Sequence, residues 1–277
     1  MPASYLCRRS VLAWVGATIM ASPAAAQFIP QPELLGEKWK ATGNGGDPDY
    51  GPWADFLSKW LRQPSDGVTR VDYAGAVAAN ARAPLKAWLD QTQKIDPTTL
   101  SSSAAFTWWT NLYNAATIDL VLKEYPVRTI LQIEGGLFNT GPWDEKILSV
   151  NGEALTLNNV EHGILRPIWN DPRVHYAVNC ASIGCPNLKA TPWTSATLES
   201  DLEAGAKAYI NHPRGAEVEN GQLVVSKIYD WFEVDFGDST QGVLAHLRQY
   251  AEGQLAKRLA NIGRISNSRY DWNLNAA

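Results

Sequence analysis

Two histidines and two cysteines lie close together in the sequence, between residues 162 and 185. They are His162, His175, Cys180 and Cys185, and Glu161 directly precedes the first of them. The whole chain has four histidines and three cysteines, so this stretch holds half of its imidazoles and most of its thiols. Imidazole and thiolate are the groups most often used for acid–base and nucleophilic chemistry near neutral pH. The stretch is therefore the first candidate for a functional site.

The cysteine pair has several interpretations. In an exported protein, two cysteines close in sequence favour a structural disulfide. A free Cys180 would instead be a candidate nucleophile of a hydrolase or acyl transferase. The C-x4-C spacing differs from the C-x-x-C of thioredoxin-like proteins, which weakens a redox role. A metal site shared with the histidines would have nonstandard ligand spacing, so we expect neither a metal nor a cofactor.

Either His175 or His162 could act as the base for Cys180. The run 174–178 is typical of a strand, on which His175 and Cys180 would point to opposite faces if the strand continued that far. A direct contact between them then requires the strand to end near Asn179. His162, on the preceding predicted helix, is the geometric alternative as the partner of Cys180.

Glu161 and Asn111 are the candidates for orienting that base. On a helix Glu161 and His162 point about 100° apart, so they do not form the paired ligands of a zinc protease. Glu161 could instead pair with an arginine such as Arg166 or Arg173. Asn111 and Asn114 share a helix face. They either tie a neighbouring loop to their helix or supply the third group of a Cys-His-Asn arrangement.

Local patterns predict the elements that must position these residues. Apolar spacing predicts helices over 53–61, 73–92, 104–123, 195–210 and 241–258. Ser101 to Ser103 offer N-caps for the helix over 104–123, and Asn158 is placed to cap another helix over 159–165. Asn151-Gly152 predicts a hairpin of 147–150 with 154–157, and 223–228 is a further strand. Helices predominate around a small central sheet, so we predict an α+β fold, with a papain-like or transglutaminase-like arrangement as the candidate.

The N-terminal residues 1–26 are typical of an export signal. Arg8 and Arg9 precede a short apolar run, and Ala24-Ala25-Ala26 offers a cleavage site. The run is too short to span a bilayer, and the arginine pair also loosely fits a twin-arginine signal. We expect a mature chain that starts at Gln27 and is periplasmic or secreted. Residues 27–52 would form an extended arm, and 53–277 a single α+β domain.

Charge and hydropathy exclude some partners. The net charge is −4, and it becomes more negative when Arg8 and Arg9 are removed with the signal. No basic patch stands out, which argues against nucleic acid as a partner. No later segment has the length and hydropathy of a transmembrane helix. The chain has 12 Trp and 10 Tyr, which indicate a large aromatic core or groove, and we expect an unidentified small-molecule or peptide ligand.

Six motifs follow one another in a fixed order over most of residues 53–251. They are Val71-Asp-Tyr73, Trp109-Thr-Asn-Leu-Tyr-Asn-Ala115, Leu157-Asn-Asn-Val-Glu-His-Gly-Ile-Leu-Arg166, Asp171-Pro-Arg-Val-His175, Asn179-Cys-Ala-Ser-Ile-Gly-Cys-Pro186, and Asp230-Trp-Phe232 with Asp235-Phe236. Together they resemble the family called domain of unknown function 547. Thr110 departs from that pattern, since members usually carry an aliphatic residue there. The resemblance implies a shared set of residues and no established activity.

Two hypotheses follow for the function. The first is a cysteine-dependent hydrolase or acyl transferase, with Cys180 as nucleophile, His175 or His162 as base, and Asn111 or Glu161 as the orienting group. The second is a non-catalytic ligand-binding or scaffold domain, in which Cys180 and Cys185 form a disulfide. A disulfide between these cysteines would exclude a thiol nucleophile in the resting state, so their oxidation state separates the two hypotheses.

Overall fold

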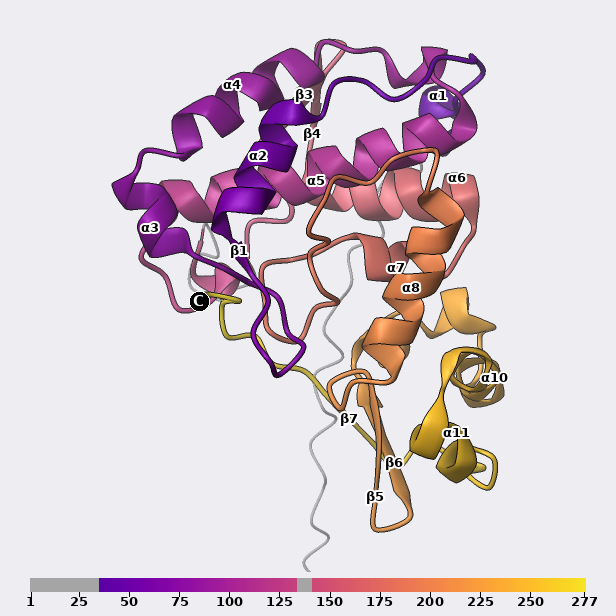
Figure 1. The fold of residues 1–277 in the computed structure, drawn as a ribbon. Coiled ribbons are helices and arrows are strands. Elements are labelled where there is room, and N and C mark those ends of the chain that lie inside the picture. The colour runs from indigo at the N-terminus through magenta and orange to yellow at the C-terminus, as the bar shows by residue number, and fades with distance from the viewer. Residues whose placement is uncertain (1–34, 134–140) are drawn as a thin grey trace, which may run out of the picture. The chain divides into compact units, whose positions relative to one another are not determined.

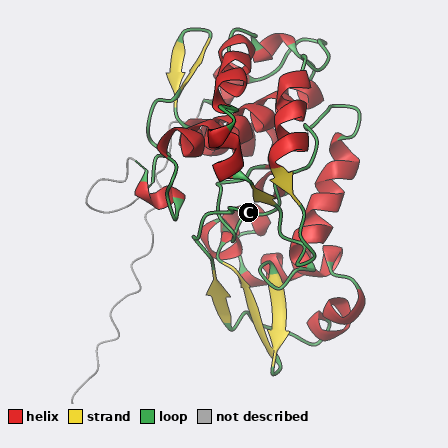
Figure 2. Ribbon diagram, turned by 60° about the vertical axis from the view of Figure 1, so that its left-hand side comes forward, coloured by secondary structure: helices red, strands yellow, loops and turns green. Residues whose placement is uncertain are grey.

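The computed structural model describes residues 35–133 and 141–277 (Figure 1). The expected export signal and the first part of the expected arm, 27–34, lie outside the described residues. The α+β class is confirmed, with helices predominating (Figure 2). The expectation of one small central sheet is wrong, because the described strands form two two-stranded sheets and one three-stranded sheet, separate from one another.

Helix α5, Ser102–Glu124, is the central element of the first hydrophobic cluster. Ser101 caps it by accepting a hydrogen bond from the N–H of Ala104, as the sequence predicts. Its buried residues are distributed over all faces of the helix, so neighbouring elements cover every face. A buried polar residue on such a helix costs stability unless a neighbouring element supplies a hydrogen-bond partner.

Shorter helices belong to the same hydrophobic cluster as α5. These are α1 (Gly36–Trp39), α2 (Gly51–Trp60), α3 (Tyr73–Ala78) and α4 (Arg82–Thr92), and the one-turn helices η1 (Pro97–Thr99) and η2 (Ile130–Gln132) lie in the connections. The predicted helix over 73–92 is two helices, because Asn80 takes a left-handed conformation with φ of 51°. Trp53, Trp88 and Trp109 are among the buried aromatics of this cluster.

Two small antiparallel pairs border the first cluster. Strand β1 (Leu61–Arg62) pairs with β2 (Arg70–Val71), and β3 (Leu148–Val150) pairs with β4 (Glu153–Leu155). The second pair is the predicted hairpin. Its turn residues Asn151 and Gly152 both have positive φ, at 50° and 78°, which explains why Asn-Gly marks the turn in the sequence.

Three short helical segments then follow: η4 (Asn159–Leu165), α6 (Arg166–Trp169) and α7 (Val174–Ala177). The prediction of a helix at 159–165 is confirmed, but its cap is Thr156, whose hydroxyl accepts from the N–H of Asn159. The prediction of a strand over 174–178 is wrong. Asp171 accepts the N–H of Arg173 and starts a turn that leads into α7, so strand alternation does not apply to His175.

The second hydrophobic cluster is built by the C-terminal elements. They are α8 (Leu198–Ile210), β5 (Ala216–Glu219), β6 (Gln222–Ser226), α9 (Ile228–Trp231), η5 (Glu233–Phe236), α10 (Thr240–Tyr250), α11 (Gly253–Leu259) and β7 (Asn267–Arg269). Strand β6 pairs antiparallel with β5 and parallel with β7. The predicted helix over 241–258 is wrong as one element, because Ala251 is extended and separates α10 from α11.

The segment after β7 returns to the first cluster, and the C-terminus lies near β1 in Figure 1. The N–H of Leu274 donates to the carbonyl of Arg128, and that of Asn275 donates to Ala181. The hydroxyl of Tyr73 donates to the side chain of Asn275. Residues 270–275 thus connect the two clusters. None of the helices in 35–133 and 141–277 combines the length and hydropathy that a membrane span needs.

Candidate functional site

His175 on α7 is buried, with 3% of its surface exposed, and both of its ring nitrogens face a carboxylate. Its Nε2 lies 2.6 Å from Oδ2 of Asp235, and its Nδ1 lies 3.8 Å from Oε1 of Glu161. The ring stacks on Phe232, with centroids 4.3 Å apart and planes 19° apart. Because Asp235 can only accept, Nε2 is the donor, and in the neutral ring the lone pair is then on Nδ1.

Asp235 on η5 joins His175 to an arginine. Nε and Nη2 of Arg166 donate to its two oxygens at 2.6 and 3.0 Å. Burial would raise the pKa of Asp235, but the hydrogen bonds from His175 and Arg166 outweigh this and hold its pKa well below the usual range. Asp235 is therefore a fixed carboxylate at neutral pH, held by a bidentate arginine.

Glu161 occupies the space between the two imidazoles. Its Oε2 accepts a hydrogen bond from the hydroxyl of Tyr113 on α5, at 3.0 Å. Its Oε1 is 3.8 Å from Nδ1 of His175 and equally far from Nδ1 of His162. Burial raises the pKa of Tyr113, and the charge of Glu161 adds to this effect. The tyrosine therefore keeps its proton and fixes one oxygen of Glu161, while the other oxygen faces both rings.

His162 is held as a neutral imidazole. Nη1 of Arg166 lies 3.3 Å from its Nδ1. Burial lowers the pKa of His162, and the charge of Arg166 lowers it further, so that together they outweigh Glu161. A guanidinium has no lone pair to offer, so Nδ1 is the acceptor and the ring hydrogen is on Nε2. His162 thus presents Nε2 as a donor.

We call Glu161, His162, Arg166, His175 and Asp235 the acid–base cluster. Three of its members come from η4 and the residue that follows it. Residues Asn159–Leu165 form a π-helix, in which hydrogen bonds run from i to i+5, and the N–H of Arg166 accordingly donates to the carbonyl of Glu161. Such wide turns are rare and frequently found at functional sites. The wide turn here brings Glu161, His162 and Arg166 to one place.

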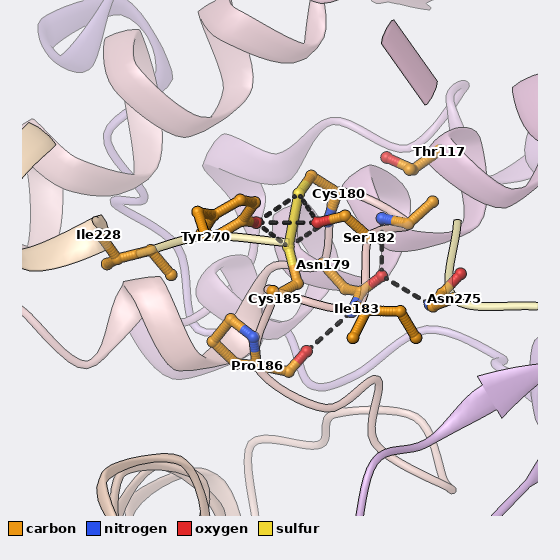
Figure 3. Close-up of a disulfide and its surroundings, with 12 residues drawn as sticks. Thr117, Asn179, Cys180, Ser182, Ile183, Cys185, Pro186, Ile228, Tyr270 and Asn275 are labelled. Atoms are coloured by element: carbon orange, nitrogen blue, oxygen red, sulfur yellow. Dashed lines mark hydrogen bonds between the residues drawn. A yellow bond between two sulfur atoms is a disulfide. The ribbon is translucent and has the colours of Figure 1, made fainter. Parts of the chain in front are cut away.

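Cys180 and Cys185 form a disulfide (Figure 3). Cys180 is half-buried, whereas only 4% of Cys185 is exposed. The hydroxyl of Tyr270 lies 3.1 Å from each sulfur, and that of Ser182 lies 3.2 Å from Sγ of Cys180. The N–H of Cys180 also donates to Sγ of Cys185, at 3.0 Å. The disulfide is therefore surrounded by hydrogen-bond donors.

The loop that carries the disulfide is also held by other bonds. The side chain of Asn179 accepts from the N–H of Ala181 and donates to the carbonyl of Pro186. The N–H groups of Ile183 and Gly184 donate to the backbone of the C-terminal segment. A disulfide across so short a loop contributes about 2 kcal/mol through chain entropy. Hydrogen bonds therefore add to the disulfide in holding this loop in place.

The two asparagines of α5 bond to backbone. Asn111 donates to the carbonyl of Trp193 at 2.8 Å and accepts its N–H at 3.0 Å. Asn114 donates to the carbonyl of Ala177 at 2.9 Å and accepts the N–H of Asn179 at 2.8 Å. Both asparagines are at most 1% exposed. They tie the loops on either side of the site to α5, which is the first of the two roles predicted for them.

The structure thus brings together three of the five predicted site residues, Glu161, His162 and His175. Cys180 bonds to Cys185, and Asn111 is occupied by the backbone of Trp193. The expectation that Glu161 pairs with Arg166 or Arg173 is wrong: Arg166 binds Asp235, and Arg173 binds Asp171 and Glu199.

The sequence reasoning missed three residues: Asp235 and Arg166, which belong to the cluster, and Tyr270, which lies at the disulfide. Arg166 was considered only as a partner of Glu161. Asp235 stands in one of the six motifs, and that was the available signal for it. Tyr270 lies outside every motif, so no sequence signal pointed to it. In the described part of the chain, no three or more His, Cys, Asp and Glu side chains are arranged to hold a metal ion.

A hollow of about 680 Å³ lies elsewhere, along the β3–β4 hairpin. Lys146, Asn151, Glu153 and Asn159 are among its lining residues. None of the acid–base cluster and neither cysteine lines it. We place the candidate site at the cluster instead, because the groups able to carry protons or form covalent bonds are there.

The comparisons with known proteins give one match. The family model described as "Protein of unknown function, DUF547" matches residues 97–210, which confirms the resemblance over that part of the chain. The match includes α5, η4, His175 and both cysteines, but Asp235 and Tyr270 follow it. The search of curated proteins found no match, and neither did the search of solved structures.

Proposed function

We propose that this chain is an exported hydrolase or acyl transferase that uses the acid–base cluster to act on an ester or amide carbonyl. One observation carries the proposal: His175 is fixed through Nε2 by Asp235, at 2.6 Å, while Nδ1 faces Glu161 across 3.8 Å. An imidazole oriented by a carboxylate is the arrangement that general bases of acyl-transfer enzymes use.

Each cluster residue has a role in this proposal. His175 takes a proton at Nδ1 from a water molecule as the water oxygen bonds to the carbonyl carbon, and returns that proton to the leaving group. Asp235 stabilises the imidazolium that forms, and Glu161 is close enough to add to this. His162 is neutral with Nε2 as a donor, which suits it to stabilise a developing oxyanion. Arg166 positions Asp235, and its charge adds to the burial that lowers the pKa of His162.

The thiol version of the mechanism is the second candidate. It needs Cys180 as nucleophile, with His175 or His162 as base and Asn111 as the orienting group, in the papain-like manner. Cys180 is held in a disulfide and Asn111 is bound to Trp193, so a thiol nucleophile would exist only after reduction. A water nucleophile needs neither residue, and for that reason we prefer it for the resting protein.

The test is turnover of chromogenic acyl compounds. The full chain is assayed with a panel of p-nitrophenyl esters and peptide p-nitroanilides, with and without a reductant. His175→Ala should lower turnover by about 100-fold, the usual scale for loss of a general base. The matched control is His212→Ala, since His212 lies outside the cluster and bonds to the backbone of Asp66. Thermal melting of each variant separates loss of chemistry from loss of fold.

Three outcomes would contradict the water mechanism. One is equal turnover by His175→Ala and the native chain. Another is turnover that appears only with a reductant and disappears in Cys180→Ser, which would establish the thiol mechanism. The third is no turnover of any compound on the panel by the folded native chain, which would favour the ligand-binding or scaffold role.

Export is part of the proposal and has its own test. The support for it is Arg8-Arg9, the apolar run and the three alanines that end at residue 26. Mass spectrometry of the protein from its native source should show a mature chain that begins at or near Gln27, in the periplasm or the medium. Recovery of native material that still carries Met1 would refute export with cleavage.

A further inference from the structure

The two sulfurs of the disulfide differ in access. Cys180 is half-buried, whereas Cys185 is buried and enclosed by the chain. The exposed part of this pair therefore lies at Cys180, and a thiolate from another molecule would approach the disulfide from that side. The rate of thiol–disulfide exchange depends on which sulfur is attacked and on how well the departing thiolate is stabilised. Access therefore favours Cys180 as the attacked sulfur and Cys185 as the leaving group.

The surroundings of Cys185 suit it to leave as a thiolate. Its sulfur accepts the N–H of Cys180 at 3.0 Å and lies 3.1 Å from the hydroxyl of Tyr270. Burial raises the pKa of Tyr270, so the hydroxyl keeps its proton and can donate to a negative sulfur. Hydrogen bonds to the charged form stabilise that form. The hydroxyl of Tyr270 also contacts Cys180 and Ser182, so it can donate a hydrogen bond to either sulfur (Figure 3).

The loop can open its disulfide without losing its place in the fold. Asn179 bridges Ala181 and Pro186. Ile183 and Gly184 are tied to the C-terminal segment, and Nη1 of Arg214 donates to the carbonyl of Ile183 at 3.0 Å. These bonds hold the loop from both sides, independently of the two sulfurs.

From these three observations we propose that Cys180–Cys185 is a thiol–disulfide exchange site for a dithiol of another protein. A thiolate of that dithiol bonds to Sγ of Cys180, the bond between the two sulfurs breaks, and Cys185 leaves as a thiolate. The second thiol of the partner then attacks the mixed disulfide and releases Cys180. The partner dithiol is oxidised to a disulfide, and Cys180–Cys185 is reduced to two thiols with the two protons taken up.

The first experiment compares the two cysteines in the full chain, with Cys7→Ser as the common background. Cys185→Ser leaves Cys180 free, and Cys180→Ser leaves Cys185 free. The probe is glutathione disulfide, and the formation of mixed disulfide is followed by mass spectrometry. Cys180 should react at least about tenfold faster than Cys185, because exchange depends on access to the thiol. Equal rates for the two cysteines would overturn the proposal.

The second experiment needs no cysteine substitution beyond that background. The oxidised chain is mixed with a dithiol peptide, quenched with acid at intervals, and mapped for mixed disulfide. The mixed species should contain Cys180. Tyr270→Phe should slow reduction of the disulfide about tenfold, since a donor to the leaving thiolate is lost, while Tyr250→Phe, a tyrosine away from the loop, should not. Mixed disulfide at Cys185, an unchanged rate in Tyr270→Phe, or unfolding of the chain on reduction would each refute the proposal.

Discussion

The two asparagines of α5 are fully buried, whereas the acid–base cluster includes the partly buried Arg166 and Asp235, and the polar groups of the two regions have different partners. Asn111 and Asn114 bond to backbone N–H and carbonyl groups on both sides. In the cluster, His175 and Arg166 both bond to the carboxylate of Asp235. Backbone partners do not titrate, so the asparagines fix geometry at any pH. The cluster instead contains two imidazoles beside the charged side chains of Asp235 and Arg166, and imidazoles in such surroundings are suited to proton transfer.

The largest effect is expected from removing both amides. In the double variant Asn111→Leu, Asn114→Leu, backbone donors and acceptors of Trp193, Ala177 and Asn179 lose their partners while buried. Each site should cost about 2 kcal/mol, so the free energy of unfolding should fall by about 4 kcal/mol. Urea unfolding measures it, with Asn111→Leu alone expected to cost about 1–3 kcal/mol. A loss below about 1 kcal/mol in the double variant would mean that these bonds do not hold the loops.

Measuring the free energy of unfolding as a function of pH sharpens the contrast between amides and titrating groups. His246 on α10 has a tyrosine hydroxyl as its close partner, with Nε2 2.7 Å from that of Tyr176, and burial lowers its pKa to about 4. Between about pH 6.5 and pH 4 the unfolded chain therefore binds more protons than the folded chain. The contribution of neutral His246 to the free energy of unfolding is fully present above this window and is lost as the pH falls through it. The loss should be about 3 kcal/mol.

Urea midpoints at pH 7, 5.5 and 4 measure this loss. His246→Gln should flatten the dependence over that window, because the titrating group is gone. Asn114→Leu should lower stability equally at all three values, because an amide does not titrate. A native chain whose stability is constant from pH 7 to pH 4 would rule out the buried neutral state of His246.

A smaller effect is expected from Asp235→Asn. The pKa of Asp235 lies below its usual range, so its contribution to stability is present above about pH 4 and is lost as the pH falls further. At pH 7 the variant should be about 1–2 kcal/mol less stable than the native chain, through weakened bonds to Arg166 and His175. The difference should shrink toward pH 2 in urea unfolding. Exposed Asp230→Asn is the matched control and should show no such difference.

The smallest effect, of opposite sign, is expected at Thr110. This residue is fully buried on α5, and within the described residues its hydroxyl has no hydrogen-bond partner. It stands where the resembling family usually carries an aliphatic residue. Thr110→Val should raise the free energy of unfolding by up to about 1 kcal/mol, since an unpaired buried hydroxyl is removed and the shape is kept. Differential scanning calorimetry would detect this, and a clear loss of stability would reveal a partner for the hydroxyl.

Sequence reasoning succeeded where the determining signal is local. The cap at Ser101 and the apolar pattern of α5 lie within a few residues of each other, and Asn151-Gly152 specifies its own turn. It failed at α7, because four residues carry too little periodicity to separate a helical turn from a strand. Asp235 lies 60 positions after His175, and Tyr270 lies 90 after Cys180. Pairings over such distances depend on tertiary packing, which one sequence does not reveal.

The segment 270–275 has a consequence for the order in which the molecule assembles. It places Tyr270 at the disulfide, and Asn275 bonds to Tyr73 across 202 positions of the chain. Closing so long a loop costs more entropy than closing the local turns of α5 or the β3–β4 hairpin. Contacts of this separation also slow folding. The helices and the hairpin therefore form early. The contact of Tyr270 with the two sulfurs forms late, when the rest of the chain is largely folded.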